Sequence, residues 1–218
     1  MGSEAGGTRG TLRGYREFRR GLRELERGAA GSASPFRELV GAIAEDHRVL
    51  VETTAKYDAR QRDLGSPART FVTNIGFQLV VAYRVMRFMR ALGLPLGARF
   101  TSRAIRHLYG SDVHWDAELA PGLVVVHGFG MAIGYAARTA HGCILAQNVT
   151  LGVGHDAETG AQGGPDLREN VVVGPGAALI GPILIGAGSK IMAGCTVHQS
   201  VPPRTLVEAP AVSMRPRS

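Results

Sequence analysis

Histidine and cysteine are the residue types in this chain that most readily carry out chemistry. The 218 residues include seven histidines and two cysteines. A neutral imidazole, whose ordinary pKa is about 6.5, can accept a proton from a hydroxyl and so act as a general base. His127 and His155 are the two histidines that fall where a regular sequence pattern is interrupted, so they are the candidate site residues. We expect the other histidines to be structural.

That pattern is a six-residue repeat, which is clearest between Leu167 and Pro202. A period of six fits neither an α-helix nor a long strand, but it fits a chain that bends after each short strand. It therefore predicts a parallel β-helix, in which three short strands form each triangular coil and the apolar positions stack inside. The first series of these positions is Leu167, Val173, Leu179, Ile185, Ile191 and Val197, and the second is Val171, Ala177, Ile183, Ser189, Cys195 and Val201.

The same repeat continues upstream and is interrupted twice. The upstream positions are Val113, Leu119, Val125, Ile133, Thr139, Leu145 and Leu151, and the step from Val125 to Ile133 is eight residues rather than six. That longer step contains His127. The second interruption is a Gly-rich loop, expected to leave the coil at 153–166, and it contains His155. A regular prism offers few places for chemistry, so both interruptions are candidate sites. Cys143 and Cys195 fall on inward positions and are expected to be buried thiols.

Helical patterns precede the repeat, and the fold class is therefore α + β. Residues 1–33 are expected to be a flexible start with an amphipathic, Arg-rich helix from Thr11 to Arg27. Residues 34–110 form a predicted helical domain, residues 111–205 the β-helix of four to five coils, and residues 206–218 a tail. The helices are expected from Ser34-Pro35 towards Tyr57, across Phe71 to Leu92, and from Leu94 to Tyr109. Polar and basic residues interrupt the Phe71 to Leu92 segment, which favours a buried helix over a membrane span.

Composition and charge narrow the possible partners. The formal net charge is +7, and 44% of the residues are hydrophobic. A basic chain can bind nucleic acid, an anionic membrane or a phosphate-rich ligand, but aromatic–basic interleaving typical of nucleic-acid binding is missing. A phosphate-rich cofactor and a merely solvated arginine surface both stay open. No secretory signal pattern begins the sequence, so we expect a cytoplasmic protein. Exposed strand edges at the ends of a β-helix favour an oligomer.

Several local strings, together with the repeat, carry a family resemblance. They are Phe77 to Arg84, Asp112-Val113-His114, His127-Gly128, Val149 to Gly152, and Val201 to Thr205. The chain resembles the bacterial serine acetyltransferases of the hexapeptide-repeat acyltransferase superfamily. This resemblance implies a left-handed β-helix, a homotrimer or a dimer of trimers, acetyl-CoA or another acyl-CoA as cosubstrate, and no metal.

The resemblance also assigns roles to residues. His127 stands where the family has its general base, and Asp112 stands where an aspartate orients that base. General-base catalysis of this kind accelerates a reaction by about 10²–10⁴. For coenzyme A, the matching positions are Gly152, Gly174, Lys190 and Ala193, although each glycine is equally well explained as a turn former.

Departures from the family bear on the acceptor alcohol. Gln162-Gly163-Gly164 precedes Pro165 where the family has an Arg-His pair for the substrate carboxylate, and Val126 replaces an aspartate. Asp63 keeps a predicted acceptor contact, and His155 is a possible further one. A buried carboxylate without its cation is costly, so we expect an acceptor other than free L-serine: a carrier-bound or modified amino alcohol, such as a natural-product intermediate.

Other functions stay open at this point. They are a sugar or polysaccharide O-acetyltransferase, a genuine serine O-acetyltransferase, a γ-carbonic-anhydrase-like metal enzyme and a non-catalytic scaffold. The metal enzyme is disfavoured because the sequence lacks its His-x4-His pair. The long isoleucine-ending tail that docks cysteine synthase is also missing, so no cysteine synthase complex is expected.

Overall fold

The computed structural model describes residues 34–57, 65–156 and 158–210. The predicted Arg-rich helix at Thr11 to Arg27, the predicted acceptor residue Asp63 and the tail from residue 211 lie outside the described residues. The chain divides into residues 1–38 and residues 39–218. The contacts discussed below lie within the second unit, and the predicted domain boundaries stay predictions.

Four helices precede the strands: α2 (Pro35–Tyr57), α3 (Pro67–Thr73), α4 (Ile75–Ala91) and α5 (Pro95–Tyr109). The predicted start of α2 and the predicted end of α5 before Gly110 are confirmed. The single helix predicted from Phe71 to Leu92 is wrong, because the chain leaves the helical conformation at Asn74. The Asn74 side chain accepts a hydrogen bond of 2.9 Å from the Phe77 N–H, which starts a new helix. None of the described helices is long and apolar enough to cross a membrane.

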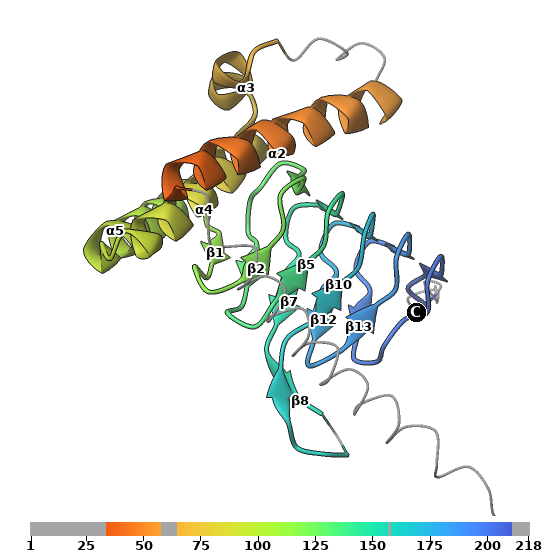
Figure 1. Cartoon of the computed structure of the whole chain (residues 1–218). Helices are drawn as coiled ribbons and strands as arrows, with labels where there is room; N and C mark the ends of the chain where they lie inside the picture. Colours follow the sequence, from red (N-terminus) through yellow and green to blue (C-terminus); the bar gives the residue numbers. More distant parts are fainter. Residues whose placement is uncertain (1–33, 58–64, 157, 211–218) are drawn as a thin grey trace, which may run out of the picture. The chain divides into compact units, whose positions relative to one another are not determined.

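The strands build a parallel β-helix with three faces (Figure 1). The chain visits the three faces in turn, so each circuit forms one coil, and the sheets give five coils. The first sheet contains β1 (Asp112–Val113), β4 (Ala132–Ile133), β7 (Thr150–Gly152), β12 (Ala178–Ile180) and β15 (Thr196–Val197). The second contains β2 (Glu118–Leu119), β5 (Arg138–Thr139), β10 (Asp166–Leu167) and β13 (Leu184–Ile185). The third contains β3 (Val124–Val125), β6 (Ile144–Leu145), β11 (Val172–Val173), β14 (Lys190–Ile191) and β16 (Leu206–Val207).

The core of the prism is the predicted set of stacked apolar positions. In the first sheet the pairing register places Val113, Ile133, Leu151, Leu179 and Val197 above one another. All these side chains are buried, as are the other positions that the repeat predicted to face inward. The two cysteines are buried and free, as expected. Six residues take the chain to the equivalent inward position on the next face, so each full coil stacks its buried side chains on those of the coil before it.

The second interruption leaves the coil between β7 and β10, as predicted. It forms a short antiparallel hairpin of β8 (Gly154–His155) and β9 (Gln162–Gly163), in which His155 pairs with Gln162 (Figure 1).

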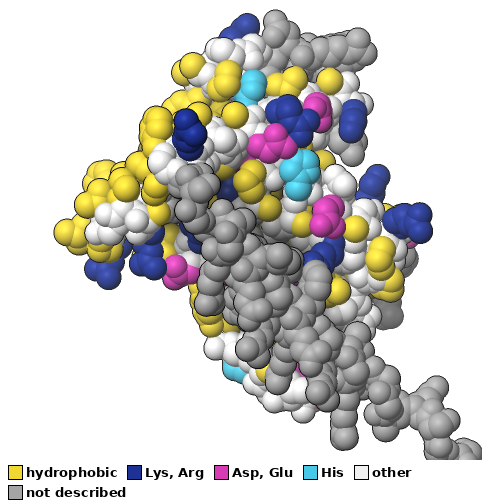
Figure 2. Space-filling view, in the orientation of Figure 1, with side chains coloured by type: hydrophobic (Ala, Val, Ile, Leu, Met, Phe, Trp, Pro, Cys, Tyr) yellow, Lys and Arg dark blue, Asp and Glu magenta, His cyan; other side chains and the backbone are white. Residues whose placement is uncertain are grey.

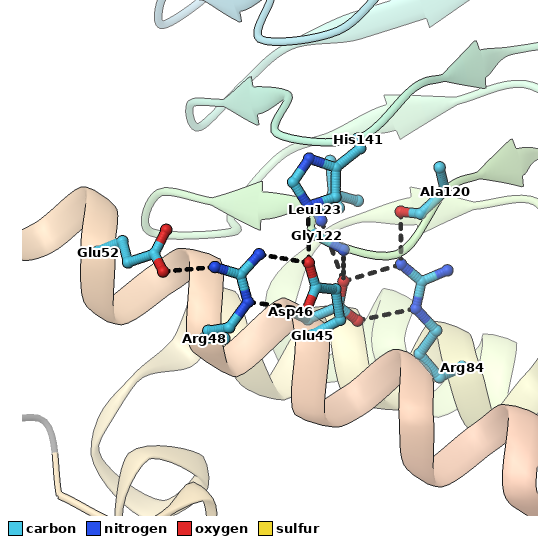
Figure 3. Close-up of polar contacts among 9 residues, drawn as sticks. All are labelled: Glu45, Asp46, Arg48, Glu52, Arg84, Ala120, Gly122, Leu123 and His141. Atoms are coloured by element: carbon cyan, nitrogen blue, oxygen red, sulfur yellow. Dashed lines mark hydrogen bonds and ion pairs between the residues drawn. The ribbon is translucent and has the colours of Figure 1, made fainter.

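A buried ion pair joins the helices to the first coil (Figure 3). Asp46 of α2 is 0% exposed and accepts hydrogen bonds from Arg84 of α4 at 2.8 and 3.0 Å. The same carboxylate accepts hydrogen bonds from the backbone N–H groups of Gly122 and Leu123 at 2.8 and 3.0 Å. Arg84 also donates to the Ala120 carbonyl at 2.8 Å. The pair therefore satisfies backbone groups at a turn of the prism, which makes a buried charge tolerable.

An exposed network lies beside this pair (Figure 3). Glu45 accepts hydrogen bonds from Arg48 and contacts His141 of the second coil at 2.7 Å, and Arg48 also pairs with Glu52. The Arg48 guanidinium and then His141 lower the pKa of the Glu45 carboxyl to about 2. Because these groups are exposed, solvent screens the interaction.

Candidate functional site

The first interruption widens one corner of the prism. We call the turn between a strand of the third sheet and the next strand of the first sheet the third corner. After β6, β11 and β14 this corner has four residues, at 146–149, 174–177 and 192–195. After β3 it has six residues, 126–131. His127 lies on this widened corner, so the eight-residue step in the sequence corresponds to an enlarged turn.

His127 has an unusual backbone conformation and an exposed side chain. Its φ is 67°, in the left-handed region that few residues other than glycine adopt. Among the residues that the structure describes, the His127 ring makes no hydrogen bond or ion pair. An exposed imidazole on a fixed turn is available to accept a proton from a bound hydroxyl. Strained backbone of this kind is common at functional sites.

Buried hydrogen bonds hold the widened corner in place. Ser111 is fully buried, and its hydroxyl donates to the Gly128 carbonyl at 2.8 Å and accepts from the Met131 N–H at 3.1 Å. The Gly130 N–H donates to the Tyr109 carbonyl at 3.2 Å. The corner is therefore held by the segment that connects α5 to β1.

The start of α4 also packs against this corner. A Cβ added to Gly76 would lie 1.9 Å from the Val125 carbonyl oxygen, and one added to Gly128 would lie 3.2 Å from the Gly76 Cα. The helix backbone can come this close only because residue 76 has no side chain. Gly76 therefore brings α4 against the turn that carries His127.

Asp112 lies next to the corner but has another partner. The Asp112 N–H donates to the Met131 carbonyl at 2.7 Å, which places Asp112 directly against the end of the widened turn. The Asp112 carboxylate pairs with Arg106 of α5, with an N–O distance of 2.7 Å. Among the described residues, no hydrogen bond joins Asp112 to His127. The role of Asp112 in orienting the His127 ring therefore stays a prediction. In that role the His127 ring would have to compete with the Arg106 guanidinium for the Asp112 carboxylate.

The predicted coenzyme A residues do not form one cluster in a single chain. Gly174 and Ala193 lie at the third corner, on the same edge of the prism as His127. Gly152 ends β7 at the opposite edge of the first sheet, and Lys190 begins β14 with an exposed side chain. A Cβ on Gly174 would lie 2.8 Å from the Ala193 nitrogen, so stacking of adjacent coils alone requires this glycine.

The predicted acceptor residues also lie apart. Val126 is half-exposed next to His127, whereas His155 follows the edge where first-sheet strands end. Gly163 and Gly164, where the resemblance leads one to expect an Arg-His pair, are tightly packed. A Cβ on Gly163 would lie 2.8 Å from the Pro182 Cβ, and one on Gly164 would lie 2.6 Å from the Ala136 carbonyl carbon. Larger residues do not fit at either position.

The sequence prediction missed the residues that hold the corner. Ser111, Gly76, Tyr109 and Arg106 were not singled out, because their roles depend on contacts distant in sequence. One signal was available: Gly76 is a glycine inside an apolar helical segment, and such a residue usually has a packing reason.

Serine acetyltransferases are among the characterised proteins similar to this chain. No protein-family model matches the chain. The serine acetyltransferase of Synechococcus elongatus is 40% identical over 130 residues, which are 58% of this chain and 51% of that protein. The crystal structure of Neisseria gonorrhoeae serine acetyltransferase superposes with a TM-score of 0.67 and 25% identity, covering 84% of this chain and 69% of that one. The chain is serine acetyltransferase-like.

Two further neighbours of this serine acetyltransferase-like chain were solved with bound molecules. The Neisseria protein in complex with serine has a TM-score of 0.66 and 24% identity, covering 82% of this chain and 73% of that one. A serine acetyltransferase in complex with CoA has a TM-score of 0.64 and 23% identity, covering 76% and 66%. The shared fold confirms the predicted left-handed β-helix. The chain spans about half the length of its relatives in sequence, 51% in the Synechococcus protein.

Proposed function

We propose that this chain is an acetyl-CoA-dependent O-acetyltransferase of the serine acetyltransferase type, with His127 as its general base. The observation that carries the proposal is the widened third corner, which presents an exposed imidazole on a rigid turn in a fold shared with serine acetyltransferases. The CoA complex of one neighbour supports acetyl-CoA as the donor.

The proposed chemistry is direct transfer between two bound substrates. His127 accepts the proton of the acceptor hydroxyl while the hydroxyl oxygen attacks the thioester carbonyl carbon. The tetrahedral intermediate collapses by breaking the carbon–sulfur bond, and the imidazolium returns the proton to the departing CoA thiolate. The products are an acetyl ester and free CoA, and no covalent bond to the protein is formed.

The comparisons favour L-serine as the acceptor over the modified amino alcohol that the sequence predicted. The relatives are named serine acetyltransferases, and one neighbour binds serine. One observation favours the second candidate, an acceptor whose carboxylate is masked. Gly163 and Gly164 replace the family's Arg-His pair, and the surrounding packing leaves no room for larger side chains.

A thiol-release assay separates these candidates. The full-length protein is incubated with acetyl-CoA and one of four acceptors: L-serine, L-serine amide, a simple amino alcohol or a monosaccharide. Thiol release that depends on L-serine, with kcat/KM at least tenfold above that for serine amide, supports the first candidate. The reverse ratio supports the masked acceptor. Release with none of the alcohols would contradict the proposed function and favour a scaffold.

The oligomeric state belongs to the same proposal. A trimer would place the third corner of one subunit near an edge of another, and could bring together residues that lie apart in one chain, such as His127 and His155. Sedimentation equilibrium should give three or six times the 23.1 kDa chain mass. A monomer with full activity would contradict a shared site.

A further inference from the structure

Helix α5 has its large apolar side chains on the outside. The residues of this helix that pack inward are mostly small: Ala98, Ser102 and Ile105 are buried. Its largest apolar side chains face solvent, since Leu96 is 76% exposed, Phe100 77% and Leu108 68%. The turn before the helix continues this surface with Leu92, 49% exposed, and Leu94, 54% exposed. Adjacent exposed apolar side chains of this size usually mark an interaction surface.

We call Leu92, Leu94, Leu96, Phe100 and Leu108 the α5 patch. Figure 2 shows hydrophobic side chains gathered at the end of the molecule where α4 and α5 lie, with basic side chains next to them. None of these five side chains belongs to the hydrophobic core of the described residues. Removing them from the surface would therefore leave the packed interior unchanged.

The unpaired charges that α5 carries beside the patch are basic. From Leu64 to Ser111 the sequence contains seven arginines and no aspartate or glutamate. Arg84, Arg90 and Arg106 pair with acidic residues outside this segment. Arg99 and Arg103 project from α5, and neither forms an ion pair within the described part of the chain. The apolar patch is thus bordered by two uncompensated cations.

We propose that the α5 patch docks on an anionic lipid surface. A helix that presents leucine and phenylalanine beside arginine matches the interface between headgroups and acyl chains, where apolar groups enter and cations bind lipid phosphate. A second copy related by a twofold axis through α5 fits less well, because that contact would bring Arg99 and Arg103 close to the same arginines. Residues 1–33 are also a poor cover for the α5 patch, because they carry seven arginines against four glutamates and so add positive charge beside Arg99 and Arg103.

Vesicle sedimentation tests this proposal with the full-length protein. The probes are sucrose-loaded vesicles of phosphatidylcholine with 30% phosphatidylglycerol, and vesicles of phosphatidylcholine alone. We expect binding to the anionic vesicles at least tenfold stronger than to the neutral ones, and its loss at high salt. The double variant Arg99→Gln/Arg103→Gln should weaken anionic binding about 25-fold, since each arginine contributes about fivefold near such a surface.

The contribution of the apolar side chains is tested with the double variant Leu96→Ser/Phe100→Ser, which should also weaken binding to anionic vesicles at least tenfold. Val72→Ser on α3 is the matched control, because Val72 is 76% exposed but lies outside the patch; Lys56→Gln is the matched charge control. Both controls should stay within twofold of the unsubstituted chain. No binding to anionic vesicles, or binding that the α5 variants leave unchanged, would overturn the proposal. A lower oligomer mass for Leu96→Ser/Phe100→Ser would also overturn it, by showing that a second copy covers the patch.

Discussion

The third corner of the prism occurs four times between paired strands, and only its first occurrence differs. The later corners have four residues and close by stacking: the Gly174 N–H, for example, donates to the Ile191 carbonyl of the next coil at 2.8 Å. Their left-handed positions are filled by Asn148, Gly176 and Gly194, which tolerate that conformation. The first corner has two more residues. Gly130 lies against Asn148 and fills the equivalent left-handed position, and His127 is an additional left-handed residue before it.

The two kinds of corner are stabilised by different parts of the chain. A four-residue corner needs only the coils on either side. The widened corner depends on residues outside the repeat. Helix α4 packs against it at Gly76, and the Ser111 hydroxyl donates a hydrogen bond to the Gly128 carbonyl. The repeat therefore provides the scaffold, and the helices hold in place the turn that could do chemistry.

The largest expected effect on stability comes from adding one methyl group to Gly76. In Gly76→Ala the new Cβ meets the Val125 carbonyl oxygen, so α4 and the corner must separate. We expect unfolding to require about 3 kcal/mol less free energy, and kcat to fall at least tenfold. Gly41→Ala is the control, because nothing lies within 4 Å of its Cβ in α2, and this change should stabilise by about 0.5–1 kcal/mol. Denaturant unfolding measures the free energy of unfolding of both variants. Equal changes in Gly76→Ala and Gly41→Ala would refute the role of Gly76.

Much of the scaffold could be predicted, because each inward position of the repeat is set by local spacing. The break at His127 and the loop with His155 were visible as changes in that spacing. The supports of the corner were not, because Ser111 and Gly128 are seventeen residues apart and Gly76 acts on Val125 across the fold. The Asn74 break in the predicted helix was missed because a cap is decided by one side-chain hydrogen bond.

A pair of buried serines compares the two kinds of corner directly. Ser111 bonds two backbone groups of the widened turn, and Ser189 similarly donates to the Pro202 carbonyl at 2.8 Å and accepts from the Thr205 N–H at 3.1 Å in a regular coil. Ser111→Ala and Ser189→Ala should each cost about 1–3 kcal/mol of stability, because buried groups lose their partners. At saturating acetyl-CoA, only Ser111→Ala should lower kcat, by at least fivefold. Equal losses of kcat would show that the widened turn is not special.

The smallest effect on kcat is expected at Cys143, a fully packed position in a regular part of the repeat. Burial raises the pKa of the Cys143 thiol to about 12, so at pH 8 only about one thiol in ten thousand is a thiolate. Iodoacetamide at pH 8 should not label Cys143 in the folded protein, should label it in guanidinium chloride, and should label it faster in the folded state only as the pH approaches that raised pKa. Cys143→Ala should leave kcat within twofold. Rapid labelling of the folded protein at pH 8 would contradict the buried position.

The most direct test of the catalytic corner is the turnover of His127→Ala with saturating acetyl-CoA and the best acceptor. His198→Ala is the control, because this histidine is exposed on the last coil. If His127 is the general base, kcat falls by about 10²–10⁴ while Tm and CoA binding stay unchanged, and His198→Ala stays within twofold. A His127→Ala protein that keeps kcat within fivefold of the unsubstituted chain would contradict the account.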